Sequence, residues 1–367
     1  MEELELLGEL DHLPGGEDIQ RVRARNPRVV NRRLDPMTAL SDAEFKSHFR
    51  FNKDSVLRLV EILNLGRMNN RERPLTPVQQ VCIALNFYAG GHFTRIAGLC
   101  GGVSQKAAWL AIERVTNQLC LLKDQYIHMP TDQEMQETAT RLEAKFHLPR
   151  FAFGIDGVVM IFDGAPREIP EGTVKQDYWN RKMRYAINVQ VIGNDRHLIY
   201  DINVDWQGCT RDARIWKNSP AKRVIERQRR YLLAGDSAYP ISENLMTPYR
   251  TAEALANPRR RLFNRRLSGL RTVCTENIFG ILKRRWPRLT ELRCKHLRAR
   301  RIIVAIAILH NIAIRWNDGE PVGGNSNRDF PVAPEQQYEI IADDAEPVVV
   351  RARGQQLRDQ LCDNMPP

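Results

Sequence analysis

The sequence predicts a mixed α/β protein in which an all-α region precedes a core built on a β-sheet. Residues 41–123 show the helical spacing of apolar side chains, whereas residues 151–162 form an almost unbroken apolar run. Such a run is typical of a strand that is buried on both faces of a sheet. Residues 185–192 and 198–204 then alternate in the manner of two further strands.

The length and the charge of the chain limit the classes of function that fit it. The chain has 367 residues, enough for more than one hydrophobic core. Its net charge of +11 favours a polyanionic partner. Residues 1–19 contain acids and no Lys or Arg, residues 259–301 hold fifteen Lys and Arg against two acids, and the chain is acidic again beyond residue 318. This distribution predicts nucleic-acid binding, and a solvated basic face without a partner is the alternative.

Several protein classes do not fit. No apolar stretch reaches the ~18 residues that a membrane span requires, and no basic segment precedes an apolar one at the start, so we expect no signal peptide. The seven cysteines form neither a CxxC pair nor a Cys/His cluster with zinc spacing. We therefore expect an intracellular protein with reduced thiols and no zinc finger.

The first part of the chain divides into an acidic and polar tail (1–35), a helical domain (36–130) and a linking helix (131–150). Ser41 with Glu44 forms a capping box, and Ser104 can cap a helix over residues 105–122. With a short helix at 93–99 before the glycine turn, the pattern has the outline of a helix-turn-helix. A helical bundle without DNA contacts gives the same pattern, so both interpretations stay open.

Residues 151–316 are predicted to form the second domain. Three strands are followed by a helix near Asp212 and by a short strand that ends on Gly235 and Asp236. This order is the plan of a ribonuclease-H-like fold. A loop-rich basic stretch (247–270) precedes a helix over 272–286, and 298–316 is a buried helix. The acidic tail (317–367) is expected to be disordered.

Three acids stand on separate predicted elements, namely Asp156, Asp236 and Glu276. A buried carboxylate is costly unless it is paired or binds a metal, and carboxylate oxygens suit Mg²⁺ and Mn²⁺. Three of them could hold two divalent ions for phosphodiester chemistry, with Asp156 as the bridging ligand. Taken singly, Asp236 could be a turn residue and Glu276 an exposed helix acid.

Asp212 is a fourth candidate. It stands at a predicted helix N-terminus, where capping or support of the site is the more common role and direct metal ligation the alternative. Candidate DNA contacts are the basic turn Asn180, Arg181 and Lys182, together with Lys283, Arg284 and Arg285 at the end of the Glu276 helix.

The chain resembles the transposase-derived nucleases of the PIF/Harbinger superfamily, which belong to the DDE endonucleases. The segments that carry the resemblance are IDG (155–157), YWNRKMRYAINVQV (178–191), GCTRDARIW (208–216), GDSAYP (235–240), LMTPYR (245–250), ENIFGILKRRW (276–286) and LHNIA (309–313). The resemblance spans residues 35–316 and depends on the whole set of segments. Two positions depart from it: Val159 and Arg211 stand where the family usually has histidine.

The resemblance implies a ribonuclease-H-like catalytic core with Asp156, Asp236 and Glu276 as its carboxylate triad. It also implies a divalent metal, a DNA substrate, a nuclear location and a separate Myb-like DNA-binding partner. The sequence leaves the oligomeric state open. A DNA-binding adaptor that has lost cleavage, with Val159 and Arg211 as signs of drift, is the main alternative, and a ribonuclease with the same metal chemistry is the weaker one.

Overall fold

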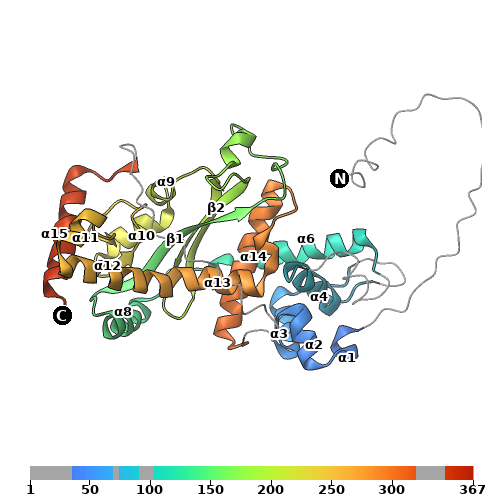
Figure 1. Cartoon of the computed structure of the whole chain (residues 1–367). Coiled ribbons are helices and arrows are strands. Elements are labelled where there is room, and N and C mark those ends of the chain that lie inside the picture. Colours follow the sequence, from blue (N-terminus) through green and yellow to red (C-terminus); the bar gives the residue numbers. More distant parts are fainter. Residues whose placement is uncertain (1–34, 69–73, 91–102, 320–343, 367) are drawn as a thin grey trace, which may run out of the picture. The chain divides into compact units, whose positions relative to one another are not determined.

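The protein contains a five-stranded sheet with β1 as its central strand. Figure 1 shows the computed structural model. The structure describes residues 35–68, 74–90, 103–319 and 344–366. The strand order is β3-β2-β1-β4-β5. The strands are β1 (Phe151–Ile161), β2 (Ala186–Gly193), β3 (Ile199–Gln207), β4 (Leu232–Ala234) and β5 (Leu245–Met246). β1 pairs antiparallel with β2 and parallel with β4, so the predicted strands are confirmed and β5 is added.

Helices surround this sheet, and most are connected by short turns. Before the sheet lie α1 (Pro36–Ala39), α2 (Asp42–Phe49), α3 (Lys53–Leu63), α4 (Pro77–Tyr88), α6 (Gln105–Leu121), α7 (Lys123–Tyr126) and α8 (Asp132–Phe146). Between and after the strands lie α9 (Asp212–Lys217), α10 (Pro220–Gln228), α11 (Thr251–Ala256), α12 (Pro258–Arg271), α13 (Asn277–Arg285), α14 (His296–Arg315) and α15 (Val348–Asn364). Short turns of other helical types are η2 (Lys175–Tyr178), η3 (Thr272–Glu276) and η4 (Pro287–Thr290).

The two faces of β1 are covered by different helices. Ile155 belongs to an apolar cluster with Trp216 of α9 and Ile225 of α10. Gly154 points to the other face, where a Cβ atom would meet the side chain of Cys274 in η3. Because successive strand residues point to opposite sides, Asp156 shares the face of Gly154, whereas Gly157 shares the face of Ile155.

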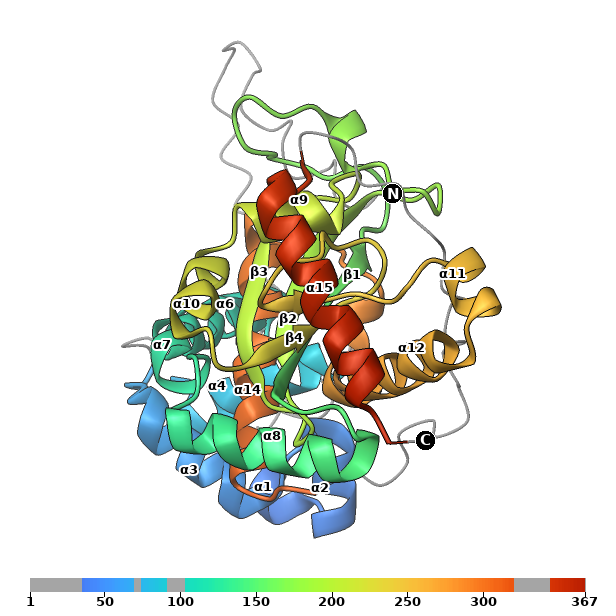
Figure 2. The same cartoon turned by 90° about the vertical axis from the view of Figure 1, so that its left-hand side faces the viewer.

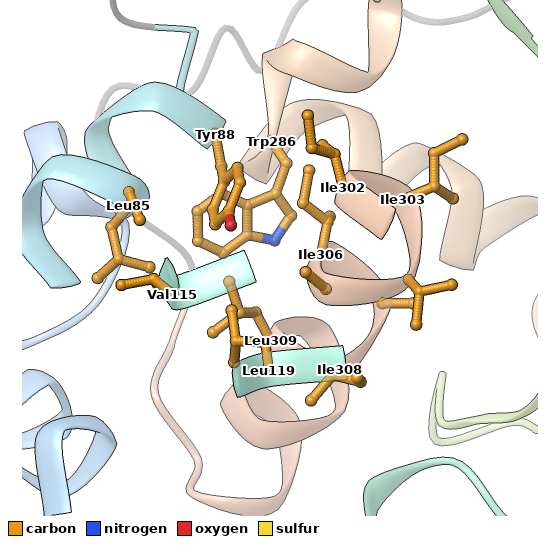
Figure 3. Close-up of a cluster of buried hydrophobic side chains, with 14 of the residues drawn as sticks. Leu85, Tyr88, Val115, Leu119, Trp286, Ile302, Ile303, Ile306, Ile308 and Leu309 are labelled. Atoms are coloured by element: carbon orange, nitrogen blue, oxygen red, sulfur yellow. The ribbon is translucent and has the colours of Figure 1, made fainter. Parts of the chain in front are cut away.

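The N-terminal helices do not form a core of their own. Tyr88 of α4 and Val115 of α6 belong to the same apolar cluster as Trp286, which follows α13, and Ile306 of α14, as Figure 3 shows. That cluster continues to Val189 on the sheet, and residues 33–367 make up one compact unit. The predicted division near residue 130 is therefore a change of secondary structure within a common core.

The helix starts follow the predicted capping chemistry. Ser41 and Glu44 form the expected capping box, and the Ser104 hydroxyl accepts a hydrogen bond from the backbone of Ala107. The predicted short helix at 93–99 lies outside the described residues. The helix-turn-helix interpretation thus stays a prediction.

Two segments differ from the sequence-based expectation. The stretch 247–270, expected to be rich in loops, contains α11 and α12, and Asn257 caps α12 through its side chain. The tail, expected to be disordered, contains α15, which lies against α12 and β5 (Figure 2). Leu361 and Cys362 of α15 are buried in the cluster that holds Phe263 of α12. This small apolar face stabilises α15 despite its polar composition.

His310 predicts a pH dependence of stability. It is buried on α14 and its ring donates a hydrogen bond to the carbonyl of His197 at 2.8 Å, and burial lowers its pKa from 6.5 to about 4. Between these values the unfolded chain binds the proton more tightly, so this stabilisation is complete above pH 6.5 and is lost as the pH falls towards 4. At ~1.36 kcal/mol per pKa unit the loss is about 3 kcal/mol.

Urea unfolding of the wild type and of His310→Gln, measured from pH 4 to pH 7, checks this expectation. Glutamine keeps a donor for the carbonyl and does not titrate. The wild type should therefore lose more stability than the variant over this range, and equal losses would contradict the assignment.

Candidate active site

Asp156 and Asp236 are brought together by neighbouring parallel strands. Gly154 of β1 pairs with Ala234 of β4, and each carboxylate stands two residues beyond its member of this pair. The Asp156 Oδ1 atom accepts a hydrogen bond from the backbone N–H of Gly157 at 2.8 Å, and Asp236 Oδ1 accepts one from that of Ala238 at 2.9 Å. The charge of Asp236 raises the pKa of Asp156, so the two carboxylates lie near enough to interact electrostatically.

Glu276 reaches the site from a π-helical turn rather than from a regular helix. The turn η3 (Thr272–Glu276) joins α12 to α13, which follow one another in Figure 1. The turn packs closely on β1, because a Cβ atom at Gly154 would lie 2.7 Å from Cys274 Cβ. Gly280, four residues beyond Glu276, makes no comparable approach. In the structure a Cβ there would meet only the end of the Arg284 side chain.

Arg271, the last residue of α12, bridges two of these acids. Its Nη1 atom donates to Asp156 Oδ2 and its Nη2 atom to Glu276 Oε1, each at 2.6 Å. The Thr272 hydroxyl donates to the other Glu276 oxygen at 2.9 Å. The side chains of Arg271 and Asp156 are only 8% and 14% exposed. Sequence reasoning missed Arg271, because it lies next to a stretch that was interpreted as loop.

The site concentrates more negative charge than its surroundings neutralise. Burial and then the carboxylates of Asp236 and Asp212 raise the pKa of Asp156 to about 8, although Arg271 opposes this shift. Burial also raises the pKa of Asp236, again against the effect of Arg271. Carboxyl groups in this state gain from any further cation that shares their oxygens.

Asp212 lies on the other face of the sheet. A Cβ atom at Gly157 would fall 2.3 Å from Asp212 Oδ1, which accepts a hydrogen bond from Asn188 Nδ2 at 2.9 Å. Its side chain makes no cap for α9. Burial and the nearby Asp236 raise its pKa to about 6. Its position behind β1 favours support of the site over ligation together with Glu276, and the expected capping bond is absent.

The basic turn after Trp179 approaches the acids. The positive charge of Arg181 acts on both Asp212 and Asp236 and lowers their pKa values in part. Asn180 is buried, and its Oδ1 atom accepts hydrogen bonds from the backbone of Lys182 and Arg184. Asn180 therefore shapes the turn, whereas Arg181 and Lys182 are its basic groups.

Lys283 of α13 belongs to the same neighbourhood as this turn. Burial and the positive charge of Lys182 lower the pKa of Lys283. Two lysines that approach each other in this way can attract an anionic group more strongly than either does alone.

Arg285 does not fit a DNA contact. Its guanidinium donates to the carbonyl of Arg50 and to Asp318, and it lies over the ring of Phe51. Both charged side chains are buried, at 7% and 0% exposure. The prediction of Arg285 as a DNA contact is therefore corrected: it joins α13 to the N-terminal helices. Arg284 is half-buried and stays a predicted contact.

Much of the basic run over 259–301 is likewise engaged inside the protein. Arg259 and Arg266 of α12 donate to carbonyls at the end of α15, and Arg298 forms an ion pair with Glu113. A charge count along the sequence cannot reveal such partners. The DNA-binding prediction therefore depends on the turn with Arg181 and Lys182 and on Lys283 rather than on the length of the basic run.

The donor chemistry of the three acids would suit a divalent cation. Asp156, Asp236 and Glu276 supply hard oxygen ligands of the kind that Mg²⁺ and Mn²⁺ prefer, and a cationic group already lies between two of them. Among the described residues, no three His, Cys, Asp or Glu side chains are grouped closely enough to hold a metal as they stand. Arg271 fills the space between Asp156 and Glu276 in this arrangement.

Comparison with known families identifies the segment that holds these residues. The family described as DDE superfamily endonuclease matches residues 155–311, a span that includes Asp156, Asp236, Arg271 and Glu276. This segment is similar to the DDE superfamily endonucleases. The resemblance seen in the sequence is thereby confirmed at the level of a transposase-derived DDE endonuclease.

Similar proteins align with most of the chain and not only with residues 155–311. The protein named "Putative nuclease HARBI1" is 28% identical in Bos taurus and 27% identical in Homo sapiens, and each alignment covers 86% of this chain and 89% of the relative. "Protein ALP1-like" of Arabidopsis thaliana is 23% identical over 91% of this chain and 84% of its own length. No solved structure matches the chain. In the described part of the chain, no helix has the length and apolar character that crossing a membrane would require.

Proposed function

We propose that this protein is a divalent-metal-dependent DNA endonuclease of transposase origin, with Asp156, Asp236 and Glu276 as its metal ligands. The observation that carries the proposal is that these three acids stand on three different elements, all within residues 155–311, the span that matches the DDE endonuclease family. The strand order β3-β2-β1-β4-β5, with β4 parallel to β1, supports a ribonuclease-H-like core. The two "Putative nuclease HARBI1" relatives support the nuclease class.

The residues of the chain have distinct tasks in this proposal. A pair of divalent ions would activate a water or hydroxyl nucleophile and stabilise the leaving oxygen of a phosphodiester. Asp156 is linked to Glu276 through Arg271, its pKa is raised by the charge of Asp236, and it is the candidate bridging ligand. Asp212 with Asn188 supports β1 from the opposite face. Arg181, Lys182 and Lys283 would bind the phosphate backbone and orient it, which positions DNA without selecting a sequence.

The proposal also covers how a DNA sequence is selected and where in the cell the protein acts. A net charge of +11 suits a protein that binds a polyanion, and we propose a nuclear location for it. A separate Myb-like DNA-binding protein would supply sequence specificity, as the resemblance implies. The helical segment 36–130 is the alternative source, through its predicted helix-turn-helix.

A nicking assay on supercoiled plasmid tests the proposal. We expect conversion to the open-circular form with Mn²⁺ or Mg²⁺ and none with EDTA, and we expect an RNA of matched sequence to stay intact. Cleavage that persists in EDTA would contradict the metal-dependent mechanism. DNA binding that weakens with salt, with no nicking in either metal, would instead support the adaptor without cleavage.

A further inference from the structure

We propose that Arg271 occupies a cation position between Asp156 and Glu276 in the metal-free protein and leaves it when a divalent ion binds. Arg271 would then be a positioning residue that keeps the two carboxylates assembled until the metal arrives. This inference rests on the proposed function and adds a specific residue to it.

The geometry at Arg271 is that of a cation site. One guanidinium nitrogen contacts Asp156 on β1 and the other contacts Glu276 in η3, both at 2.6 Å. Hydrogen bonds from a guanidinium to a carboxylate are among the strongest in proteins. The guanidinium thus links two elements that a shared metal ion would also link.

The guanidinium and a shared metal ion cannot occupy this place together. Both oxygens of Asp156 accept a hydrogen bond, from Gly157 and from Arg271, and both oxygens of Glu276 accept one, from Arg271 and Thr272. Mg²⁺ requires oxygens at ~2.0–2.1 Å in near-octahedral geometry. A metal ion shared by Asp156 Oδ2 and Glu276 Oε1 would take the place of the two guanidinium nitrogens that contact these atoms. Binding therefore requires the guanidinium to withdraw.

The position of Arg271 in the chain allows such a movement. It is the last residue of α12 and is followed directly by the π-helical turn η3. π-Helical turns are frequent at functional sites, and the long arginine side chain can change rotamer without a change in the backbone. A permanent ion pair that merely supports the two acids is the competing interpretation.

Titration with Mn²⁺ separates the two interpretations. The wild type, Arg271→Gln and Arg271→Lys would be titrated by calorimetry at pH 8.5, with Arg265→Gln as a matched control from the exposed side of the same helix. We expect Arg271→Gln to bind Mn²⁺ about tenfold more tightly than the wild type and to melt at a lower temperature in EDTA. Arg271→Lys, which cannot form the planar bridge, should lie between the two. The control should match the wild type.

The possible outcomes distinguish this inference from the proposed function. If both Arg271 variants bind Mn²⁺ no more tightly than the wild type, the metal ion does not displace Arg271. The nuclease proposal would then remain intact. The absence of Mn²⁺ binding in all four proteins would overturn both proposals. If Arg271→Gln does not fold, Arg271→Lys carries the test alone, and an Mn²⁺ affinity no tighter than that of the wild type would then reject the exchange.

Discussion

Replacement of Asp156 by asparagine is expected to abolish metal-dependent nicking of DNA, with a rate loss of about a thousandfold or more. Asparagine keeps the size of the side chain and one acceptor for Arg271, but it removes the charge that would hold the metal ions. A thousandfold loss corresponds to ~4 kcal/mol of transition-state stabilisation, within the several kcal/mol that metal chemistry supplies. Plasmid nicking at saturating Mn²⁺ measures it.

Asp212→Asn is the matched control for this substitution. Asp212 is a similarly buried acid whose carboxylate lies on the opposite face of β1, beside Gly157. We expect a loss of tenfold to a hundredfold at most, the usual effect of changing a residue that supports a metal ligand. Melting curves for both variants exclude unfolding as the cause. An Asp212 variant as inactive as the Asp156 variant would contradict the assignment of ligands, and full activity of Asp156→Asn would contradict the proposed function.

Gly154→Ala is expected to have the second largest effect, although position 154 carries no functional group. The added Cβ would lie 2.7 Å from Cys274 Cβ and 3.1 Å from Thr275 Cγ2, both within η3. The turn must shift away from β1, which should cost ~1–3 kcal/mol of stability, as overpacking in a core does. Because the shift moves Glu276, we expect kcat to fall about a hundredfold. Urea unfolding and plasmid nicking measure the two effects.

Gly280→Ala is the control for the glycine at position 154. A Cβ there would have only the flexible end of Arg284 within reach, at 3.4 Å. Replacement of a glycine inside a helix should stabilise α13 by ~0.5–1 kcal/mol, with activity unchanged. If Gly154→Ala unfolds like the wild type and cleaves at the same rate, then β1 and η3 do not require this close approach.

The strands and the three acids were predictable because their signals are local. A buried strand with a single carboxylate stands out in residues 151–162, and the glycine before Asp236 marks the end of the next buried strand. The helices α12 and α15 were missed for a physical reason. Arg259 and Arg266 appear in the sequence as solvated charge, but they bind carbonyls at the end of α15 and just beyond it. The composition of α12 does not reveal that α15 lies against it, and the composition of α15 does not reveal α12.

The remaining features of the site depend on tertiary geometry. A π-helical turn has no distinctive residue pattern, so Glu276 was expected on a regular helix. The link from Arg271 to Asp156 spans two elements far apart in the chain. Arg285 resembles its basic neighbours in sequence, and only the buried Asp318 shows that its role is structural.

The central place of β1 in the sheet has a consequence for how the site fluctuates. Local opening of a protein begins at termini, loops and edge strands, whereas central elements open only with the whole structure. β1 pairs with β4 up to Gly154 and with β2 from Gly154 onward, and helices cover both of its faces. Amide hydrogens near Gly154, where the two strand pairings meet, should therefore exchange with solvent at rates set by global unfolding, so that the strand that carries Asp156 stays in place for as long as the protein is folded.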